Sequence, residues 1–426
     1  MLGFLSLIVS GTLLLLVLNA GTRPLGFIDA LFTATSAVCV TGLIVVDTGK
    51  DLSLASQGVV LFMIQLGGLG VMTATTAFFL LMRERIGLRQ RMFFAGGFGL
   101  DSPSGVKSLL IRILFITFVI EGIGIIPLFF GFLNSGMTHG SSLYYAAFHS
   151  VSAFCNAGFS LFSDNLESFS RTILVPGTVI GLVVIGGLGF VVLNDLREMF
   201  RRAEKISLQT KLVLVTTVLL VISGSVVLVL TEWGSAFGDL QPGWKVWNGI
   251  FASITPRTAG FDTVAPANFS SAGIFVLVLL MLIGASPGST GGGFKTTTLA
   301  ILMVSSWSFL KGRHEVQLWN RRLPFHVVQR SITVVVLYLG TLLVGMGLLA
   351  LIEPFPFRTL LFEAVSALGT VGLSLGVTPE LTYAGKIVLV LMMFWGRVGI
   401  VTFLYSLLKR EIRERVSYPS EEVPVG

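Results

Sequence analysis

The chain has 426 residues, of which 53% are hydrophobic and only 12% are charged. A soluble globular protein of this length needs about twice that charged fraction to cover its surface, so the composition excludes that class. Lysine and arginine outnumber aspartate and glutamate by 29 to 22, but the cations fall in separate short segments, which argues against nucleic acid as a partner.

Continuous apolar runs recur along the whole chain. Those long enough to cross about 30 Å of hydrocarbon as helices are Leu2–Leu18, Val59–Met82, Ile111–Leu133, Ile173–Leu193, Leu212–Leu230, Ile332–Ile352 and Ile387–Leu408. A transmembrane barrel would show alternating rather than continuous apolar residues. The first run lacks the cationic start of a signal peptide, so we interpret it as a helix of the fold, with a cleaved signal as the alternative. The sequence therefore predicts an all-α integral membrane protein.

One pattern occurs four times, and each copy ends at a glycine: Gly42, Gly158, Gly260 and Gly372. Relative to that glycine, position −10 is Phe, Phe, Ile and Phe, and position −6 is Ser, Ser, Ile and Ser. A second glycine interrupts an apolar run 24 to 28 residues later, at Gly67, Gly186, Gly284 and Gly396. Two glycine positions that recur at similar spacing in all four copies indicate a tandem repeat.

Each repeat is predicted to contain an apolar helix, a short half-buried helix, a glycine-containing pore loop and a second apolar helix. The predicted units are residues 1–83, 84–204, 205–323 and 324–415, followed by a C-terminal tail at 416–426. Non-helical backbone at membrane depth is tolerated only where protein encloses it or water reaches it. We therefore expect four helix–pore-loop–helix repeats, with eight transmembrane helices, around a pseudo-fourfold central pore.

The four repeated glycines suit an ion-selective filter. Such a filter replaces the water around a cation with inward-pointing backbone carbonyls, and glycine adopts the required dihedral angles without steric cost. Close helix packing is the alternative explanation, but it does not account for the fourfold register. The predicted ion-binding residues are Val40, Thr41, Gly42, Asn156, Ala157, Gly158, Thr258, Ala259, Gly260, Thr370, Val371 and Gly372.

Side chains beside the predicted filter have simpler structural explanations. Cys39 and Cys155 share one repeat position, and we interpret them as small apolar residues rather than as a disulfide or a metal site. Arg257 holds the same position in the third repeat and should point away from the pathway, toward a carboxylate such as Asp262. His149 is interpreted as a packing residue rather than a proton relay.

Charge is distributed unevenly among the loops. Of the 29 cations, 20 lie in residues 83–112, 197–211, 311–330 and 409–415, which the positive-inside rule assigns to the cytoplasm together with the C-terminus. Much of the acid lies in the loops between, at Asp29, Asp47, Asp51, Asp164, Glu167, Asp239, Asp262, Glu353, Glu363 and Glu380. Asp47, Asp164 and Asp262 are expected at the outer mouth, where they either attract cations or are ordinary solvated charges.

The third repeat contains a polar stretch at 284–298 inside an apolar segment. The preceding 13 residues, 271–283, reach only about 20 Å as a helix, so the helix must stop within the membrane. A phosphate-binding loop is disfavoured because no strand precedes it. We interpret the stretch as a gate beneath the filter, with these residues: Gly284, Ala285, Ser286, Pro287, Gly288, Ser289, Thr290, Gly291, Gly292, Gly293 and Lys295.

Arg397 follows Gly396, the repeat equivalent of Gly284. An arginine at that depth is costly and needs a partner. We expect it to bind free carbonyls of the gate stretch and to add an electrostatic barrier to cations. Snorkelling to the cytoplasmic surface is the alternative.

These motifs resemble the Trk/Ktr/HKT superfamily of potassium transporters, and most closely the membrane subunits of bacterial Ktr systems. The resemblance rests on the four filter segments, the Ser286–Thr298 stretch, the run from Ser366 to Gly376, and Gly396–Gly399. It implies K⁺ as the transported ion at the filter glycines, a gate at 284–298 with Arg397, and no organic cofactor on this chain. It further implies a homodimer in the bacterial cytoplasmic membrane and a cytosolic, nucleotide-binding KtrA-like regulatory ring on the basic loops. Na⁺ is implied as a candidate activator.

Other functional classes fit less well. A sodium-selective or sodium-coupled member of the superfamily is the first alternative, although a serine in the first filter, associated with sodium preference in plant relatives, is absent here. An alternating-access carrier would favour inverted rather than parallel repeats. A membrane enzyme is disfavoured because no nucleophile–base pair or His/Cys/Asp cluster stands at helical spacing.

Overall fold

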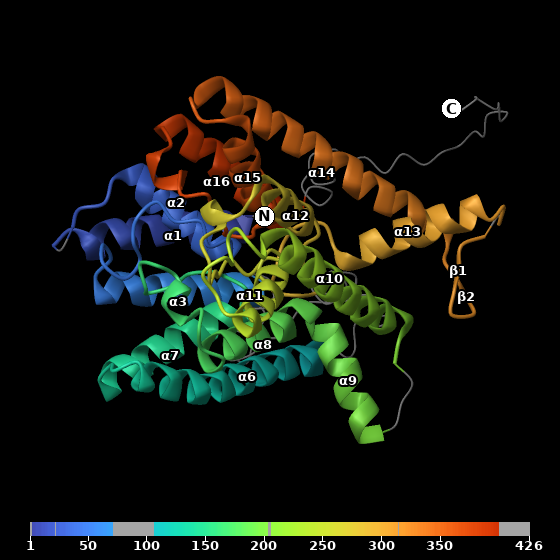
Figure 1. Ribbon diagram of the computed structural model, residues 1–426, viewed down its shortest axis with the longest axis horizontal. Helices are drawn as coiled ribbons and strands as arrows, with labels where there is room; N and C mark the ends of the chain where they lie inside the picture. Colours follow the sequence, from blue (N-terminus) through green and yellow to red (C-terminus); the bar gives the residue numbers. More distant parts are fainter. Residues whose placement is uncertain (1, 22, 71–105, 203–205, 314, 400–426) are drawn as a thin grey trace.

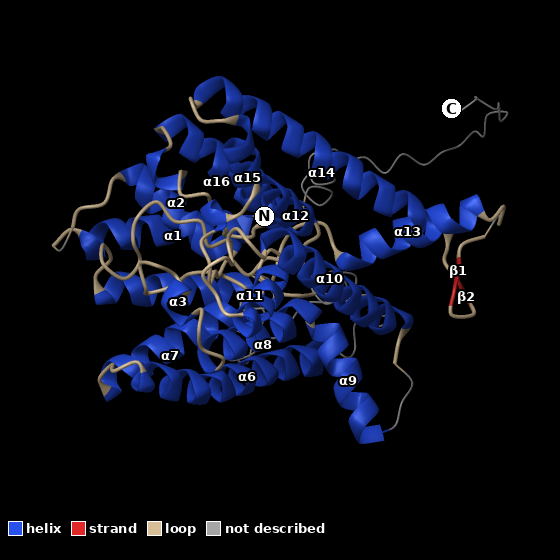
Figure 2. Cartoon of the chain, in the orientation of Figure 1, coloured by secondary structure: helices blue, strands red, loops and turns tan. Residues whose placement is uncertain are grey.

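The computed structural model describes residues 2–21, 23–70, 106–202, 206–313 and 315–399. Within these ranges the chain forms 14 α-helices, three short 3-10 helices and one two-stranded hairpin. Figure 2 shows helices surrounding a central group of loops. The predicted boundary at residue 83, the cations at 83–91 and 409–415, and the tail at 416–426 lie outside the described residues.

The helices follow the predicted order four times. The first helices of the successive repeats are α1 (Leu2–Asn19), α6 (Val106–Asn134), α10 (Leu208–Glu232) and α14 (Phe325–Ile352). The short helices are α2 (Phe27–Cys39), α7 (His139–Phe154), α11 (Pro242–Ile254) and α15 (Phe357–Gly369). The second helices are α3 (Leu54–Leu69), α8 (Leu174–Leu188), α12 (Ser271–Leu282) and α16 (Tyr383–Val398).

The remaining elements lie between or within these units. The 3-10 helices η2 (Glu167–Phe169), η3 (Pro266–Asn268) and η4 (Thr378–Glu380) follow the second, third and fourth pore loops. Helices α9 (Phe190–Arg202) and α13 (Thr296–Leu310) follow α8 and α12, and the hairpin of β1 (Gln317–Leu318) and β2 (Arg321–Arg322) precedes α14. In Figure 1, α9 and the hairpin both project on the right-hand side of the molecule.

Continuous membrane spans are fewer than the sequence predicts. Among the described residues, α6, α10 and α14 are long and apolar enough to cross a membrane, and the pair α8–α9 would make a fourth if counted as one bent span. The apolar run predicted over Ile173–Leu193 is divided between two helices, because α8 ends at Leu188 and α9 leaves it at an angle of 95°. Helices α3 and α16 likewise end at glycines with positive φ, Gly70 (81°) and Gly399 (85°). The remainders of the runs predicted to end at 82 and 408 lie outside the described residues.

Three of the glycines that recur 24 to 28 residues after the filter glycines allow a close approach between two helices. A methyl group at Gly67, Gly186 or Gly396 would overlap a backbone carbonyl at the end of a short helix. Those carbonyls belong to Val38, Phe154 and Leu368, each four residues before its filter glycine. The absent side chain therefore permits backbone-to-backbone contact between the second helix and the short helix of the same repeat.

The repeats form a closed ring. The second helix of each repeat packs against the short helix of the next, in the pairs α3–α7, α8–α11, α12–α15 and α16–α2. The last pair joins the C-terminal repeat to the N-terminal one, as the neighbouring red and blue helices in Figure 1 show. A largely buried ion pair strengthens this closure, with Lys386 Nζ 2.8 Å from Asp29 Oδ1. Asp29 therefore lies in a short helix and not in a solvated loop, contrary to the sequence interpretation.

Polar residues at the ends of three first helices hold the starts of the second helices. Asn19 Oδ1 accepts from Ser53 N at 2.7 Å, and Glu353 Oε1 accepts from Thr382 N at 3.0 Å. Glu232 accepts in the same way from the backbone and hydroxyl of Ser270. These bonds satisfy helix N-terminal donors that apolar surroundings would leave unpaired. Glu353 is thus a buried capping residue rather than a solvated loop acid.

Candidate functional site

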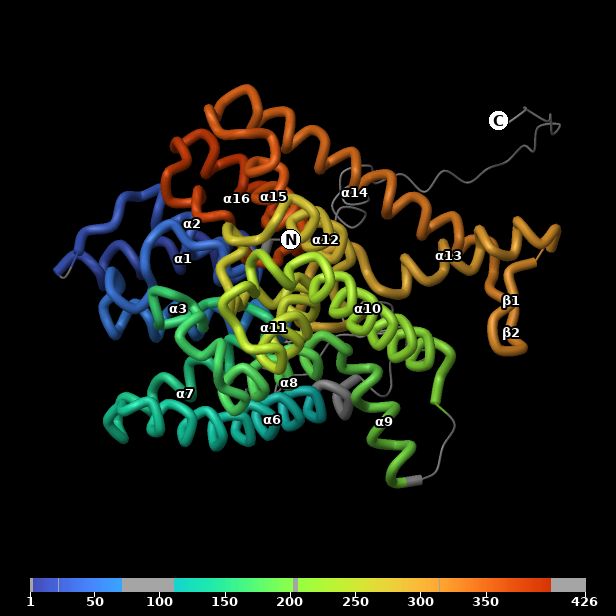
Figure 3. The backbone as a smooth tube through the Cα atoms, viewed as in Figure 1, coloured from blue at the N-terminus to red at the C-terminus, as the bar shows by residue number. Residues whose placement is uncertain are grey.

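The four repeated loops adopt one backbone conformation. Each filter glycine has a positive φ: 94° at Gly42, 69° at Gly158, 72° at Gly260 and 95° at Gly372. The residue two positions before it also lies in the left-handed region: 56° at Val40, 59° at Asn156, 68° at Thr258 and 50° at Thr370. Left-handed residues at alternate positions of a segment can turn its successive carbonyls toward the same side of the chain. The loops meet in the middle of the molecule, where the backbone traces converge in Figure 3.

The glycines also show that the loops surround a common centre. A methyl group on each glycine would come closer than 3.0 Å to the carbonyl oxygen just before the next repeat's glycine. The order is Gly42 to Ala157 O, Gly158 to Ala259 O, Gly260 to Val371 O and Gly372 to Thr41 O. The series returns to its starting repeat, so the four filter glycines and the residues just before them form one closed ring. No side chain fits at these four positions without displacing backbone.

Hydroxyl groups of the short helices form hydrogen bonds with the backbone of the filter loops. Ser36 Oγ and Ser366 Oγ accept from the N–H of Gly42 and Gly372, both at 3.1 Å, and Ser152 Oγ donates to Phe159 O at 2.8 Å. These serines stand at position −6 of their repeats. The third repeat has isoleucine there, and Thr255, one residue later, donates to Phe261 O instead. The sequence comparison missed Thr255 because the equivalent contact is made from a shifted position.

The buried polar residues beside the ring have identifiable partners. Cys39 and Cys155 are both free and buried, and the Cys155 thiol donates toward Glu121 Oε1 at 3.9 Å. Arg257 points away from the ring as expected, but it donates to Thr217 Oγ1 at 3.4 Å and not to Asp262. The predicted carboxylate partner was therefore wrong, since the nearest α10 side chain already offers an acceptor.

Two residues of the short helices hold the segment that follows the ring. His149 contacts Tyr145 O at 2.8 Å and Ser160 Oγ at 3.0 Å, so both ring nitrogens have partners in a packed aromatic cluster. At the same repeat position, Glu363 accepts from Ser374 Oγ at 2.6 Å. Glu363 is fully buried in α15, whereas the sequence analysis placed it in a loop.

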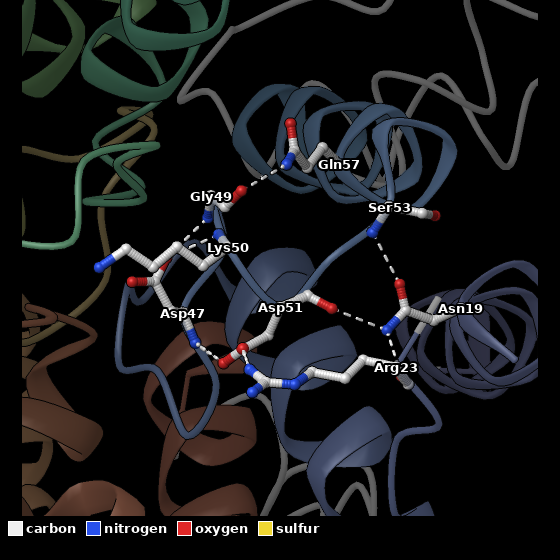
Figure 4. A network of polar contacts seen from close by, with 8 residues as sticks. All are labelled: Asn19, Arg23, Asp47, Gly49, Lys50, Asp51, Ser53 and Gln57. Atoms are coloured by element: carbon white, nitrogen blue, oxygen red, sulfur yellow. Dashed lines mark hydrogen bonds and ion pairs between the residues drawn. The ribbon is translucent and has the colours of Figure 1, made fainter. Parts of the chain in front are cut away.

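The loop after the first filter segment is fixed by its own carboxylates. Asp47 Oδ1 accepts from the N–H groups of Gly49 and Lys50 at 2.9 and 3.0 Å. Asp51 accepts from Asp47 N at 2.9 Å and pairs with Arg23. Figure 4 shows this network running from the end of α1 to the start of α3. Asp47 is thus engaged in shaping its loop rather than freely solvated.

Three further carboxyl groups lie near one another at the end of the second and third loops. Burial, and after it the charges of Glu167 and Asp164, raise the pKa of Asp262 well above its usual range. Asp164 accepts from Ser168 N at 3.1 Å. Asp262 therefore lies beside two other acidic side chains, and its Oδ1 is enclosed by protein.

The predicted break in the third repeat is present. Helix α12 ends at Leu282 and α13 begins at Thr296, so residues 283–295 form a non-helical intramembrane loop. The last three residues of the predicted stretch, 296–298, belong to α13 instead. A backbone bridge between Ile283 and Phe294 closes the loop at its base, with Gly284 N donating to Phe294 O at 2.9 Å.

The intramembrane loop lies directly against the ring. Gly292 N donates to Thr370 Oγ1 at 3.1 Å, and a methyl group at Gly291 would overlap Thr258 Oγ1. Thr290 Oγ1 donates to Phe154 O at 3.3 Å. On the repeat-2 side, Ser286 N donates to Gly187 O at 3.0 Å. Pro287 and Gly288 pack on Gly189, where a methyl group would meet Pro287 O at 2.6 Å.

Two cationic side chains bind carbonyls of this loop. Arg397 donates from Nη1 to Thr290 O and from Nη2 to Gly67 O. Lys295 Nζ donates to Gly291 O at 2.8 Å. The expectation that Arg397 binds the loop's free carbonyls is confirmed, whereas its second partner on α3 was not foreseen. Arg397 thereby ties the fourth repeat, the loop and the first repeat together.

A cavity of about 830 Å³ opens on the side of the loop away from the ring. Its walls come from α10, α13, α14 and the end of α16, and the loop itself forms one boundary through Pro287, Gly288 and Gly293. Arg397, Lys295 and Arg330 contribute to the lining. The loop therefore lies between the ring and a cavity that is lined mostly by apolar residues, carries these three cations, and is large enough for many water molecules.

Comparison with known proteins identifies the family. The TrkH family, described as cation transport proteins, matches residues 3–413. The chain is 37% identical to the Ktr system potassium uptake protein B of Bacillus subtilis, over 100% of this chain and 95% of that protein. It is also 37% identical to the potassium/sodium uptake protein NtpJ of Enterococcus hirae, over 100% and 96% of the two chains.

A solved structure supports the fold. The crystal structure of the potassium transporter TrkH from Vibrio parahaemolyticus matches with a TM-score of 0.74 at 21% identity, covering 97% of this chain and 86% of that one. The fold is thus that of an all-α membrane transporter, and the relatives in sequence are proteins of cation uptake. This chain belongs to the TrkH family of cation transport proteins.

Proposed function

We propose that this chain conducts K⁺ into the cell through a filter made of the backbone carbonyls of Val40–Gly42, Asn156–Gly158, Thr258–Gly260 and Thr370–Gly372. The observation that carries the proposal is the closed series of contacts between the four glycines, together with positive φ at the same two positions of every repeat. A pathway lined by four equivalent backbone segments can replace the hydration shell of a monovalent cation.

We further propose that the intramembrane loop is the gate. It contacts the filter segments of the third and fourth repeats and the end of α7 in the second repeat, and Arg397 links it to the first. A loop in this position blocks the route between the filter and the cavity below. Arg397 and Lys295 add positive charge there, which opposes the passage of a cation.

The orientation and partners follow from the charge pattern. We propose that the basic segments at 197–211 and 311–330 face the cytoplasm together with the C-terminus. These segments would receive a cytosolic, nucleotide-binding KtrA-like regulatory ring, and the chain would act as a homodimer with the four repeats predicted from the sequence in each subunit. The names of the Ktr system relatives support a membrane subunit that works with other components.

A sodium-conducting or sodium-coupled function is the second candidate. It is favoured by the 37% identity to a relative named for both potassium and sodium uptake. Glycine in all four filter segments is the observation that favours potassium.

Uptake assays distinguish these candidates. The full chain, produced in cells that lack their own potassium uptake systems, should restore K⁺ uptake, with Rb⁺ competing better than Na⁺. Gly42→Ser should reduce that preference, because the new side chain would displace the Ala157 carbonyl. Gly376→Ser is the matched control, since Gly376 also has a positive φ (91°) but has no atom near its missing side chain. Equal effects of the two substitutions, or better competition by Na⁺ in the unmodified chain, would contradict the potassium filter.

A further inference from the structure

The loop that follows the second filter segment reaches across to the third. Asn165 Nδ2 donates to Gly260 O at 3.1 Å, and Leu166 N donates to Asp262 O at 3.0 Å. Thr255 holds the intervening carbonyl of Phe261 from behind. Three successive carbonyls, from Gly260 at the end of the third filter segment to Asp262, therefore accept hydrogen bonds, two of them from the neighbouring repeat.

This contact breaks the fourfold symmetry of the ring. Gly260 is the filter glycine whose carbonyl accepts a side-chain hydrogen bond, and within the described part of the chain no side chain donates to the carbonyl of Gly42, Gly158 or Gly372. Asn165 stands seven residues after its own filter glycine, and the equivalent positions of the other repeats are Gly49, Ala267 and Pro379. None of these three side chains can donate a hydrogen bond.

Asn165 is itself held in a specific conformation. Its φ is 55°, in the left-handed region that asparagine tolerates better than most residues. Its backbone carbonyl lies 3.2 Å from Ser160 Oγ, and that hydroxyl lies 3.0 Å from His149 Nε2. Its backbone N–H donates to Phe162 O at 3.2 Å. The aromatic cluster around His149 thus anchors the loop that presents the amide to the filter.

We propose that Asn165 is a positioning and specificity-determining residue of the filter. Its amide fixes the direction of the Gly260 carbonyl and takes part of that oxygen's negative charge. A cation at this level then meets three carbonyls that are free and one that is shared with an N–H group. Discrimination between cations depends on the number and field strength of such oxygens, so a change at Asn165 alters it. This inference rests on the proposed potassium filter.

Two substitutions preserve the backbone and remove the donor. Asn165→Gly and Asn165→Asp both suit a left-handed residue, but neither offers an N–H to Gly260 O. Loss of one hydrogen bond corresponds to about a fivefold change in an affinity. We expect the KM for K⁺ to rise about fivefold in Asn165→Gly, with the maximal rate within about twofold of the unmodified chain. The ratio of apparent affinities for Rb⁺ and Na⁺ should fall in both variants.

The ratio of the apparent affinities for Rb⁺ and Na⁺ separates the effect of carbonyl geometry from the effect of an added charge. Asn165→Asp adds a negative charge that attracts all monovalent cations alike, so by itself the charge leaves the ratio unchanged. Asn268→Asp is the matched control, because Asn268 is an exposed asparagine on η3, outside the filter. It should leave both the ratio and the KM near their original values. Ser160→Ala, which removes the hydroxyl between His149 and Asn165, should give a smaller shift in the same direction.

The outcomes are distinct. An unmodified chain that takes up no alkali cation refutes the proposed function itself. An unmodified chain that transports, with Asn165 variants that keep its Rb⁺ to Na⁺ ratio, overturns the role of Asn165. If the variants do not accumulate in the membrane, the same comparison is made on Ser160→Ala and on purified protein, by measuring how much K⁺ and Na⁺ raise the unfolding temperature. Equal stabilisation of the unmodified protein and Ser160→Ala by each ion would then overturn it.

Discussion

Removal of the Arg397 side chain tests the proposed gate directly. The guanidinium makes two hydrogen bonds, one to the intramembrane loop at Thr290 O and one to the first repeat at Gly67 O. Hydrogen bonds to a charged group contribute about 1.5–3 kcal/mol each. If only half of the combined contribution depends on the loop's position, the blocked arrangement loses about 2 kcal/mol, which is about a 30-fold change in the equilibrium between blocked and open states.

The charge adds a second effect of similar size. A unit charge about 8 Å from a passing K⁺ raises its energy by about 2 kcal/mol at an effective dielectric constant of 20. Arg397→Gln removes the charge but keeps one donor, whereas Arg397→Lys keeps the charge and loses the two-armed geometry. We therefore expect Rb⁺ uptake to rise at least tenfold in Arg397→Gln and by a smaller factor in Arg397→Lys.

Uptake of Rb⁺ into liposomes that contain the purified chain is the suitable assay, because no regulatory partner contributes to it. Arg330→Gln serves as the control, since Arg330 lines the same cavity from α14 without a hydrogen bond to the loop. The reasoning is refuted if Arg397→Gln leaves uptake within twofold of the unmodified chain at equal protein amount. An equal rise in Arg330→Gln would assign the effect to net charge in the cavity rather than to the bridge.

Two further predictions concern the closure of the ring and the helix starts. Lys386→Met should lower the unfolding temperature of the detergent-purified chain, because it leaves the partly buried Asp29 without its cation at a cost of about 2 kcal/mol. Adding Asp29→Asn should restore most of the loss, and a double variant no more stable than the single one would contradict the pairing. Gly385→Ala should also lower that temperature, since the methyl group would overlap the Glu353 carboxylate. Gly340→Ala is the control, because a methyl group there meets open space on α14. Equal unfolding temperatures for the two alanine variants would show that the contact with Glu353 can relax.

The parts of the site that the sequence predicts are those fixed by local backbone chemistry. Gly42 and its three equivalents stand in register, and a residue forced to positive φ with no room for a side chain leaves little choice besides glycine. The end of α12 was predicted for a similar reason, because Pro287 and the glycines after it cannot continue a helix. The need of Arg397 for carbonyl partners follows from its charge and depth alone.

The parts that the sequence does not predict depend on contacts between repeats. Asn165 reaches Gly260, 95 residues away, and Arg397 reaches Gly67, 330 residues away. Nothing in the local pattern of either residue indicates which distant carbonyl it meets. Glu353 and Glu363 were placed in loops, whereas both are buried. Hydroxyl and amide donors reach both oxygens of Glu363, and Thr382 donates to Glu353 Oε1.

The position of the intramembrane loop in the third repeat follows from one register difference. Three residues after the glycine that recurs 24 to 28 residues beyond the filter glycine, the other repeats have Gly70, Gly189 and Gly399, each with a positive φ at which the helix ends. After Gly189 the chain turns and a new helix starts at once with Phe190. The third repeat has Pro287 at this position, which lacks an N–H and disfavours a helical residue before it. The next helix begins only at Thr296, and the intervening backbone bonds to itself at Gly284–Phe294 and Ser289–Ser286 but forms no helical ladder. Its other partners lie on the filter loops, on Gly187 and on Arg397, and these contacts hold the segment against the ring.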